Sequence, residues 1–445
     1  MSGSVDIPPD TKEGNPMSAT LASAAPRPKA TFTTIAAITI GNGLEFFDFT
    51  VYAFFSVIIG SLFFPARDAI DSLMLALGSY GIAFLARPIG GLVLGLYADR
   101  VGRKPAMTLT LILMAAGSLG MALAPTYAQI GVLGPIWLVT ARLIQGFALG
   151  GEVGASTSLL LEYADDHSRG YFGSWQFVSQ GLSSLLGAGI ATLLTNTLPH
   201  DALYSWGWRI PFAIGVLMVP LGVYIRRHLD ETLGHQPQAG DSSRAKLKEV
   251  FQTHAGLVWS GVLMILGGTV ATYITVFYFP TYAAQFLHMP LSLTLWASVT
   301  SSAILVPVSV LAGRLSDRVG RIPVILWSRA AMVVLVVPGF MLLVAHPQGA
   351  VLIGVVAVLS VLLALQASPG ITFITELYPR PIRATSLSVV YSVGVAVFGG
   401  TAQLIVTWLI KVTGSDLAPA WYMIAAAVIS TIPLFWLKET AGRPI

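Results

Sequence analysis

The side chains best placed to do chemistry are charged and polar residues inside apolar stretches that are long enough to cross a membrane. Asn42, Glu45 and Asp48 recur at every third position of one stretch, so on a helix of 3.6 residues per turn they lie along one side. Carboxylates within hydrocarbon are normally paired, protonated or open to water, which suits them to accept and release protons. We therefore expect Glu45 or Asp48 to carry a proton, and a structural ion pair or helix–helix hydrogen bond is the alternative.

A basic residue, Arg142, is expected on another stretch at a depth comparable with that of Asp48. Its guanidinium stays protonated and binds a carboxylate through two parallel hydrogen bonds, so it suits anion binding better than proton transfer. Arg142 could bind a substrate carboxylate, neutralise Glu45 and Asp48 when no substrate is present, or form a permanent structural salt bridge. If protonation of the acid frees Arg142 for an anionic solute, binding of the proton and binding of the solute favour each other.

Arg87, Arg209 and Arg329 also lie within apolar stretches. Arg87 precedes Pro88, where a helix kink makes a structural role as reasonable as a substrate-facing one. Arg209 follows Trp208 near the end of a stretch, and we expect it to reach the membrane interface and stack on an aromatic neighbour.

Neutral polar and aromatic side chains would complete a site for a solute. The predicted set is Asn42, Gln145, Gln180, Gln366 and Tyr278. Helix–helix hydrogen bonding is the alternative for the amides, and anchoring at the membrane interface is the alternative for the tyrosine.

The composition requires most of the surface of this 445-residue chain to face lipid. Hydrophobic residues make up 55% of the sequence and charged residues only 10%, whereas water-soluble chains carry about 25% charged residues. Twelve apolar stretches, each able to cross about 30 Å of hydrocarbon, follow one another from residue 32 onward. We therefore predict an all-α integral membrane protein with twelve transmembrane helices. There is no cysteine, the histidines are scattered and the basic residues lie in short loops, so no metal, cofactor or nucleic-acid partner is expected.

The distribution of lysine and arginine predicts the orientation of the chain. The predicted inner loops hold most of the 25 basic residues, and the predicted outer loops hold only Arg67 and Lys411. Because positively charged loops stay in the cytoplasm, both termini are expected there. Residues 1–31 are expected to form a disordered cytoplasmic tail, and residues 439–445 a short second tail.

The sequence also contains a duplication. GLYADRVGRK beginning at Gly95 returns as GRLSDRVGRI beginning at Gly313, each between the second and third span of its half. Such repeats are typical of transporters built from two related bundles. The predicted units are an N-terminal six-helix bundle over 32–228, a cytoplasmic linker over 229–252 and a C-terminal six-helix bundle over 253–438.

These features resemble the major facilitator superfamily, whose signature between spans two and three reads G-x-x-x-D-R-x-G-R-K. The residues that match it are Gly95, Asp99, Arg100, Gly102, Arg103 and Lys104. The metabolite–proton symporter branch, which includes citrate, 2-oxoglutarate, shikimate and proline/betaine symporters, is similar in five further segments. They are GNGLEFFDFTVYAF at 41–54, RPIGG at 87–91, RLIQGFALGGEVG at 142–154, WGWRIPF at 206–212 and YFPTY at 278–282. The resemblance implies a central cavity between two bundles, transport driven by a proton gradient and function as a monomer.

Eight charged residues near the predicted inner ends of the spans are expected to act in gating. They are Asp99, Arg103, Asp317, Arg321, Glu162, Arg169, Glu376 and Arg383. An acidic residue at such a position can pair with arginine or accept hydrogen bonds from a helix N-terminus. The alternative is that the basic residues only fix the orientation of the chain. Ile322 replaces the last Lys in the second signature copy, so the basic gate is expected to be weaker there.

The arginines within the spans favour transport of a small organic acid, with a citrate-like di- or tricarboxylate preferred. A zwitterion such as proline or betaine is the alternative, because aromatic side chains can bind a quaternary ammonium. Shikimate-like monoacids would satisfy the same residues, and sodium in place of the proton is left open. The sequence lacks the phosphate-loop, zinc-protease and serine-hydrolase motifs, which disfavours a membrane enzyme; a receptor is also disfavoured. The expected location is a bacterial-type inner membrane.

Overall fold

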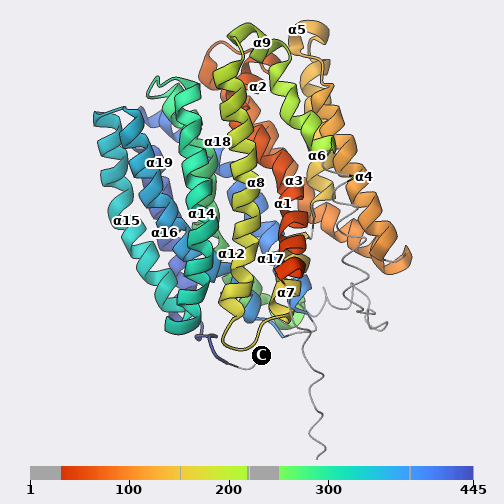
Figure 1. Ribbon diagram of the computed structural model, residues 1–445, viewed down its shortest axis with the longest axis vertical. Helices are drawn as coiled ribbons and strands as arrows, with labels where there is room; N and C mark the ends of the chain where they lie inside the picture. The colour runs from red at the N-terminus through yellow and green to blue at the C-terminus, as the bar shows by residue number, and fades with distance from the viewer. Residues whose placement is uncertain are drawn as a thin grey trace, which may run out of the picture.

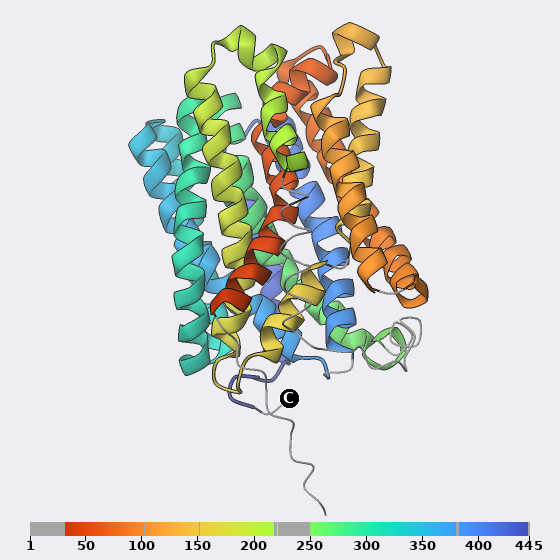
Figure 2. The ribbon, with the colours of Figure 1, turned by 45° about the vertical axis from the view of Figure 1, so that its right-hand side comes forward.

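The computed structural model describes residues 32–101, 103–150, 152–217, 220, 250–379 and 382–443. Over these ranges the chain forms helices and connecting loops, without a strand. The long helices run side by side along the longest axis of the molecule (Figures 1 and 2). We call its two ends upper and lower after Figure 1, in which the C-terminus lies at the lower end. The predicted tail over residues 1–31 and most of the predicted linker, residues 229–249, lie outside the described residues.

The N-terminal half holds the first set of helices. They are α1 (Phe32–Phe54), α2 (Ser56–Phe63), α3 (Ala69–Val101), α4 (Arg103–Ala122), α5 (Tyr127–Ile130), α6 (Leu133–Ala148), α7 (Glu152–Glu162), α8 (Arg169–Thr197), α9 (His200–Ser205) and the short η1 (Gly207–Arg209). Helical residues follow η1 as far as Leu217. The short helices α2, α5 and α9 lie at the upper end (Figure 1).

The C-terminal half holds the second set. They are α12 (Ala255–Thr272), η2 (Tyr273–Tyr278), α13 (Phe279–Gln285), α14 (Leu291–Val319), α15 (Arg321–Ala345), α16 (Gly349–Glu376), α17 (Arg383–Gly394), η3 (Val395–Gly399), α18 (Gly400–Thr413), α19 (Ala418–Thr431) and η4 (Ile432–Phe435). The segments η2 and η3 are π-helical, a local widening of the helix that is frequent at functional sites.

Most of the predicted spans are single long helices, and the others are broken. Within the described ranges, eight helices are long and apolar enough to cross a membrane, or nine if α1 and α2, bent by 64°, form one span. The remaining predicted spans correspond to Thr108–Ala122, to the helix over Gly207–Leu217 and to the pair α6 and α7. The sequence predicted one uninterrupted span over 132–161. The structure instead ends α6 at Ala148 and begins α7 at Glu152.

Close packing of α3 against α6 depends on glycine. A Cβ added at Gly90 would lie 1.8 Å from the carbonyl oxygen of Phe147, and one at Gly146 would lie 1.8 Å from the carbonyl oxygen of Ala83. Only residues without a side chain allow two helix backbones to approach so closely, as is common between membrane helices. This contact holds Arg87 of α3 and Arg142 of α6 in one region of the N-terminal half.

The two halves meet along several helix pairs. Helix α8 packs along α14, α3 packs along α18, and α7 packs against α17. Figure 1 shows α8 and α14 lying next to each other over most of their length. Residues from both halves therefore line the space enclosed between them.

Candidate functional site

A cavity between the two halves is lined by residues from both of them. Seven of its described lining residues are aromatic, four from the N-terminal half and three from the C-terminal half: Phe46, Phe49, Tyr80, Phe177, Tyr273, Phe277 and Tyr391. The π-helical segments contribute Tyr273, Phe277 and Val395 to the wall. Among the described residues that line it, the charged ones are Arg87 from the N-terminal half and Arg329 from the C-terminal half, and none is a carboxylate. The cavity therefore combines an aromatic wall with positive charge.

Both cavity arginines are buried and held without an ion pair in the described part of the chain. The guanidinium carbon of Arg87 lies 4.3 Å from the ring centre of Phe49 and 4.0 Å from that of Phe84. Arg329 donates hydrogen bonds to the carbonyl oxygens of Ser430 (2.6 Å) and Met264 (3.0 Å). Rings and carbonyl groups orient a guanidinium but leave its formal charge uncompensated, so each favours an anion nearby.

The acidic stripe of α1 is buried within the N-terminal half and does not line the cavity. Asn42 donates a hydrogen bond to Ser179 of α8, and Asp48 accepts one from Ser118 of α4. Glu45 is buried on the same helix. The three residues lie on α1 as the spacing predicted, and the partners of Asn42 and Asp48 belong to the same half.

Arg142 is completely buried and separated from the cavity by aromatic rings. Its guanidinium carbon lies 4.6, 4.2 and 5.4 Å from the ring centres of Phe49, Tyr52 and Tyr80. Its Nη1 donates a hydrogen bond of 2.8 Å to Gln145. The rings of Phe49 and Tyr80 line the cavity. Arg142 can therefore contact a solute directly only if these rings move aside.

The other predicted solute-binding residues divide into two groups. Gln180 and Gln366 line the cavity: Gln180 donates a hydrogen bond of 3.3 Å to Tyr391 of the opposite half, and the buried amide of Gln366 has no hydrogen-bond partner in the described chain. Gln145 and Tyr278 do not line it. The hydroxyl of Tyr278 instead forms a hydrogen bond of 2.8 Å with Thr407 inside the C-terminal half.

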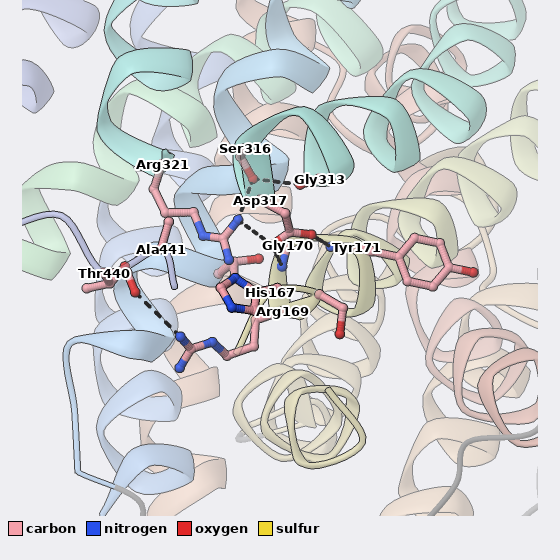
Figure 3. A network of polar contacts seen from close by, with 12 residues as sticks. His167, Arg169, Gly170, Tyr171, Gly313, Ser316, Asp317, Arg321, Thr440 and Ala441 are labelled. Carbon is pink, nitrogen blue, oxygen red and sulfur yellow. Dashed lines mark hydrogen bonds and ion pairs between the residues drawn. The ribbon is translucent and has the colours of Figure 1, made fainter. Parts of the chain in front are cut away.

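A polar network joins the halves at the lower end (Figure 3). Asp317 of α14 accepts hydrogen bonds from the backbone N–H groups of Gly170 (2.7 Å) and Tyr171 (2.8 Å) at the N-terminus of α8. Arg321 pairs with Asp317 at 2.8 Å. A carboxylate at the positive end of a helix dipole is stabilised, so Asp317 ties the C-terminal half to the first turn of α8.

A second link at the lower end is an ion-pair cluster around Glu376. This buried carboxylate lies 3.1 Å from Nε of Arg169 in the N-terminal half and 3.1 Å from Nη2 of Arg321 in its own half. Four of the eight predicted gating residues, Asp317, Arg321, Arg169 and Glu376, thus form one contact between the halves. Their repeated spacing in the sequence identified the residues but not these partners.

The other predicted gating residues are not part of this network as described. Glu162 is exposed, and Arg383 donates a hydrogen bond of 3.2 Å to the carbonyl oxygen of Tyr378. The side chains of Asp99 and Arg103 lie outside the described residues.

Glu439 is a lower-end residue to which the sequence analysis assigned no role. Its carboxylate accepts hydrogen bonds of 2.9 Å from the backbone N–H groups of Arg321 and Ile322, at the start of α15. Partial burial opposes ionisation of Glu439, but the hydrogen bonds from backbone N–H groups outweigh it and hold the pKa of this carboxyl below its usual value. Glu439 therefore caps α15 within the C-terminal half.

The halves are also joined at the upper end. Lys411 of α18 pairs with Asp68 (3.4 Å) and with Asp71, the latter in the first turn of α3. A hydrogen bond from the backbone N–H of Asp71, with the ammonium of Lys411, lowers the pKa of Asp68. Ser56 and Thr281 share a hydrogen bond of 3.3 Å between α2 and α13. The two halves are therefore in contact at both ends of the molecule.

Arg209 stacks on its neighbour in the chain, Trp208. Its guanidinium carbon lies 4.4 Å from the ring centre of Trp208, and the side chain donates hydrogen bonds to the carbonyl oxygens of Ser205 (2.6 Å) and Ala124 (2.8 Å). The predicted stacking on an aromatic neighbour is confirmed. The sequence analysis did not assign Ser118 or Arg329 to the site. The only feature that marks them in the sequence is a polar side chain within an apolar stretch, and this feature does not identify the partner of the side chain.

Two related helical halves that enclose a central cavity and contact each other at both ends have the architecture of a membrane carrier. The family model described as Major Facilitator Superfamily matches residues 38–400. The chain belongs to this superfamily, and its fold is the all-α arrangement of twelve membrane helices in two bundles. The predicted family and fold class are confirmed.

Curated relatives of this chain are transporters. The citrate-proton symporter of Salmonella typhi is 35% identical over 405 residues, which cover 89% of this chain and 92% of the relative. The proline/betaine transporter of Escherichia coli (strain K12) is 31% identical over 426 residues, which cover 92% of this chain and 84% of the relative. Both of these relatives are named as transporters.

Solved structures show the same fold. The D-xylose-proton symporter superposes with a TM-score of 0.72 at 18% identity, over 93% of this chain and 99% of that chain. The partially occluded inward-open xylose transporter XylE from E. coli gives a TM-score of 0.71 over the same share of this chain. At this level of identity the likeness establishes the fold alone.

Proposed function

We propose that this protein is a symporter that moves a small organic acid together with protons across the bacterial inner membrane. The observation that carries the proposal is the cavity between the halves, which has Arg87 and Arg329 on its walls and no carboxylate among the lining residues that the structure describes. An anion with two or three carboxylates loses its hydration on entering, and buried guanidinium groups replace part of it. The citrate-proton symporter relative supports this choice.

In this proposal Glu45 or Asp48 binds the coupled proton and Arg142 responds to it. Both carboxyl groups are buried in the N-terminal half, in the same region as Arg142. Loss of the negative charge on protonation strengthens the positive potential that Arg142 exerts on the cavity through the rings of Phe49 and Tyr80. Binding of an anion and binding of a proton then favour each other, as symport requires.

Transport by alternating access follows from the contacts at the two ends. Opening toward the lower side requires release of Arg169 from Glu376 and of Asp317 from α8, whereas opening toward the upper side requires release of Lys411 from Asp68 and Asp71. We assign the lower end to the cytoplasm, in line with the distribution of basic residues. The bundles over 32–228 and 253–438 act as the two moving bodies of a monomer.

Transport of a zwitterion such as proline or betaine is the second candidate. The rings of Phe49, Tyr80, Tyr273 and Phe277 on the cavity wall suit a quaternary ammonium. The proline/betaine transporter relatives support this alternative.

Uptake into proteoliposomes separates the two candidates. Labelled citrate and labelled glycine betaine are offered to the purified protein, each with and without an inward proton gradient. Gradient-dependent accumulation of citrate supports the proposal, whereas accumulation of betaine alone favours the second candidate. The double variant Glu45→Gln/Asp48→Asn should exchange the transported solute across the membrane without accumulating it. Accumulation by this variant would move proton coupling to other residues.

A further inference from the structure

An unbroken chain of hydrogen bonds connects Arg142 to Asp48 through two neutral side chains. Arg142 Nη1 donates to Gln145 Oε1 at 2.8 Å, Gln145 Nε2 donates to Ser118 Oγ at 3.2 Å, and Ser118 Oγ donates to Asp48 Oδ2. Every donor in this chain points away from the guanidinium and toward the carboxylate. Although both residues are described, Arg142 and Asp48 form no direct ion pair. The contact between the cation and the anion is therefore relayed.

The hydroxyl of Ser118 has a second acceptor within reach. Ser118 Oγ lies 3.0 Å from the carbonyl oxygen of Met114, one turn earlier on α4. A hydroxyl has one proton to donate and two lone pairs with which to accept. Ser118 therefore donates either to Asp48 or to Met114, and it accepts from Gln145 in both cases.

The charge on Asp48 decides between these two arrangements. When Asp48 is ionised, it can only accept, so the proton of Ser118 points to it. When Asp48 is protonated, its own O–H can donate to Ser118, and the proton of Ser118 turns to the carbonyl oxygen of Met114. Each arrangement satisfies the hydroxyl of Ser118, so the structure supplies two matched states that differ by one proton.

Few other groups in the described chain interact with the carboxylate of Asp48. Its other oxygen, Oδ1, has no hydrogen-bond partner in the described chain. A Cβ on Gly215, in the helix that follows η1, would lie 2.1 Å from it. Among the described residues, Arg142 is a charged group on another helix that acts on Asp48, and Glu45 lies about one turn earlier on α1. Ser118 is thus the polar side chain that separates the two protonation states.

We propose that Ser118 and Gln145 are positioning residues that transmit the protonation state of Asp48 to Arg142. In the ionised state the relay ends in a negative charge that compensates the guanidinium, because aligned hydrogen bonds polarise one another. In the protonated state the last link reverses and that compensation is lost. The inference rests on the proposed function for its role in symport, but the relay itself exists without any solute.

Infrared titration of the purified full-length protein tests the relay without a transported solute. The carboxyl band that titrates with Asp48 is identified by its loss in Asp48→Asn. Ser118→Ala removes the donor to the carboxylate, so the midpoint of this band should move to higher pH by about one unit, the size expected for a hydrogen bond to a charged group. Ser118→Thr, which keeps the hydroxyl, should restore the midpoint toward the wild-type value.

Gln145→Leu distinguishes a relay from a local contact, because it leaves Ser118 beside Asp48 and removes only the link to Arg142. The midpoint should again move to higher pH, by less than in Ser118→Ala, and the double variant should shift by less than the sum of the two. The matched control is Ser360→Ala, since Ser360 bonds to Ser301 and Val356 in the other half; its midpoint should stay at the wild-type value.

A wild-type midpoint in Gln145→Leu would overturn the relay, and a wild-type midpoint in Ser118→Ala would overturn the role of Ser118. If Ser118→Ala does not fold, Gln145→Leu decides alone. Failure of citrate uptake would count against the proposed function and would leave this titration unaffected, so the two proposals fail separately.

Discussion

Replacing Glu376 with Gln is expected to open the lower end of the molecule. In the closed arrangement the Glu376 carboxylate lies 3.1 Å from both Arg169 and Arg321 and is fully buried. A Gln side chain keeps the shape but removes the negative charge that holds two guanidinium groups together. Arg321 retains Asp317 at 2.8 Å, so the uncompensated loss falls on Arg169, the partner from the other half.

The size of the effect follows from this single cross-half interaction. A hydrogen bond to a charged group contributes about 1.5–3 kcal/mol. Since Arg169 also donates to the carbonyl oxygen of Arg443, it keeps part of its bonding, and the lower half of that range applies. Each 1.4 kcal/mol changes an equilibrium constant tenfold, so the population with an open lower end should rise by about 10- to 40-fold.

Labelling of single cysteines measures this shift, because the chain contains no cysteine of its own. Thr372→Cys places a thiol at the buried contact of α16 with α8, where a Cβ on Gly173 would lie 2.2 Å from the Thr372 hydroxyl. Ser56→Cys places one at the buried upper contact with Thr281. In Glu376→Gln, maleimide should label position 372 faster and position 56 more slowly.

Glu439→Gln is the matched control for the contact between Glu376 and Arg169. Glu439 is also a lower-end carboxylate, but it bonds to backbone N–H groups of its own half. The Glu439→Gln variant should therefore be labelled at position 372 at a rate near that of the wild type. Equal labelling rates in wild type and Glu376→Gln would refute the assignment of Glu376 to the contact that holds the halves together.

Three further changes test other parts of the reasoning. Arg329→Gln should weaken citrate binding by about tenfold or more, since a buried charged partner is lost; calorimetry that gives wild-type affinity would remove Arg329 from the site. Arg142→Lys should weaken citrate binding although it keeps the charge, because an ammonium cannot replace the planar group stacked on Phe49 and Tyr52; an unchanged titration would count against that role. The lowered pKa of Glu439 means that its contribution to stability is present above its ordinary pKa and lost as pH falls through the folded-state pKa. Glu439→Gln should therefore reduce the acid-dependent fall in melting temperature, and an identical fall in both proteins would exclude Glu439 as a source.

Several predictions from sequence rest on features that are local along the chain, and these agree with the structure. The length and polarity of apolar stretches predicted the membrane helices, because a helix must satisfy its own backbone in lipid. The broken pair α6 and α7 was missed, since the run of apolar residues over 132–161 continues through the break. The stacking of Arg209 was predictable because Trp208 is its neighbour in the chain.

Partners that are distant in sequence could not be predicted in this way. The duplication identified Asp317 as a charged residue of interest, yet its acceptor role toward the N–H groups of Gly170 and Tyr171 depends on how the two halves dock. Likewise, Tyr278 and Gln366 are both polar side chains within apolar stretches, and the sequence predicted both to bind the solute. Only the rotation of each helix places Gln366 on the cavity and Tyr278 against Thr407.

The sequence by itself determined the class of protein, the spans, the duplication and the charged residues inside the membrane, because hydrophobic partition and helical periodicity depend on neighbouring residues. The tertiary structure decided which of those residues meet. It enclosed Arg142 among aromatic rings, placed Arg87 and Arg329 on the cavity from opposite halves, and inserted Ser118 and Gln145 between Arg142 and Asp48. Such contacts depend on the packing and rotation of helices that are far apart in the chain, and no local pattern encodes them.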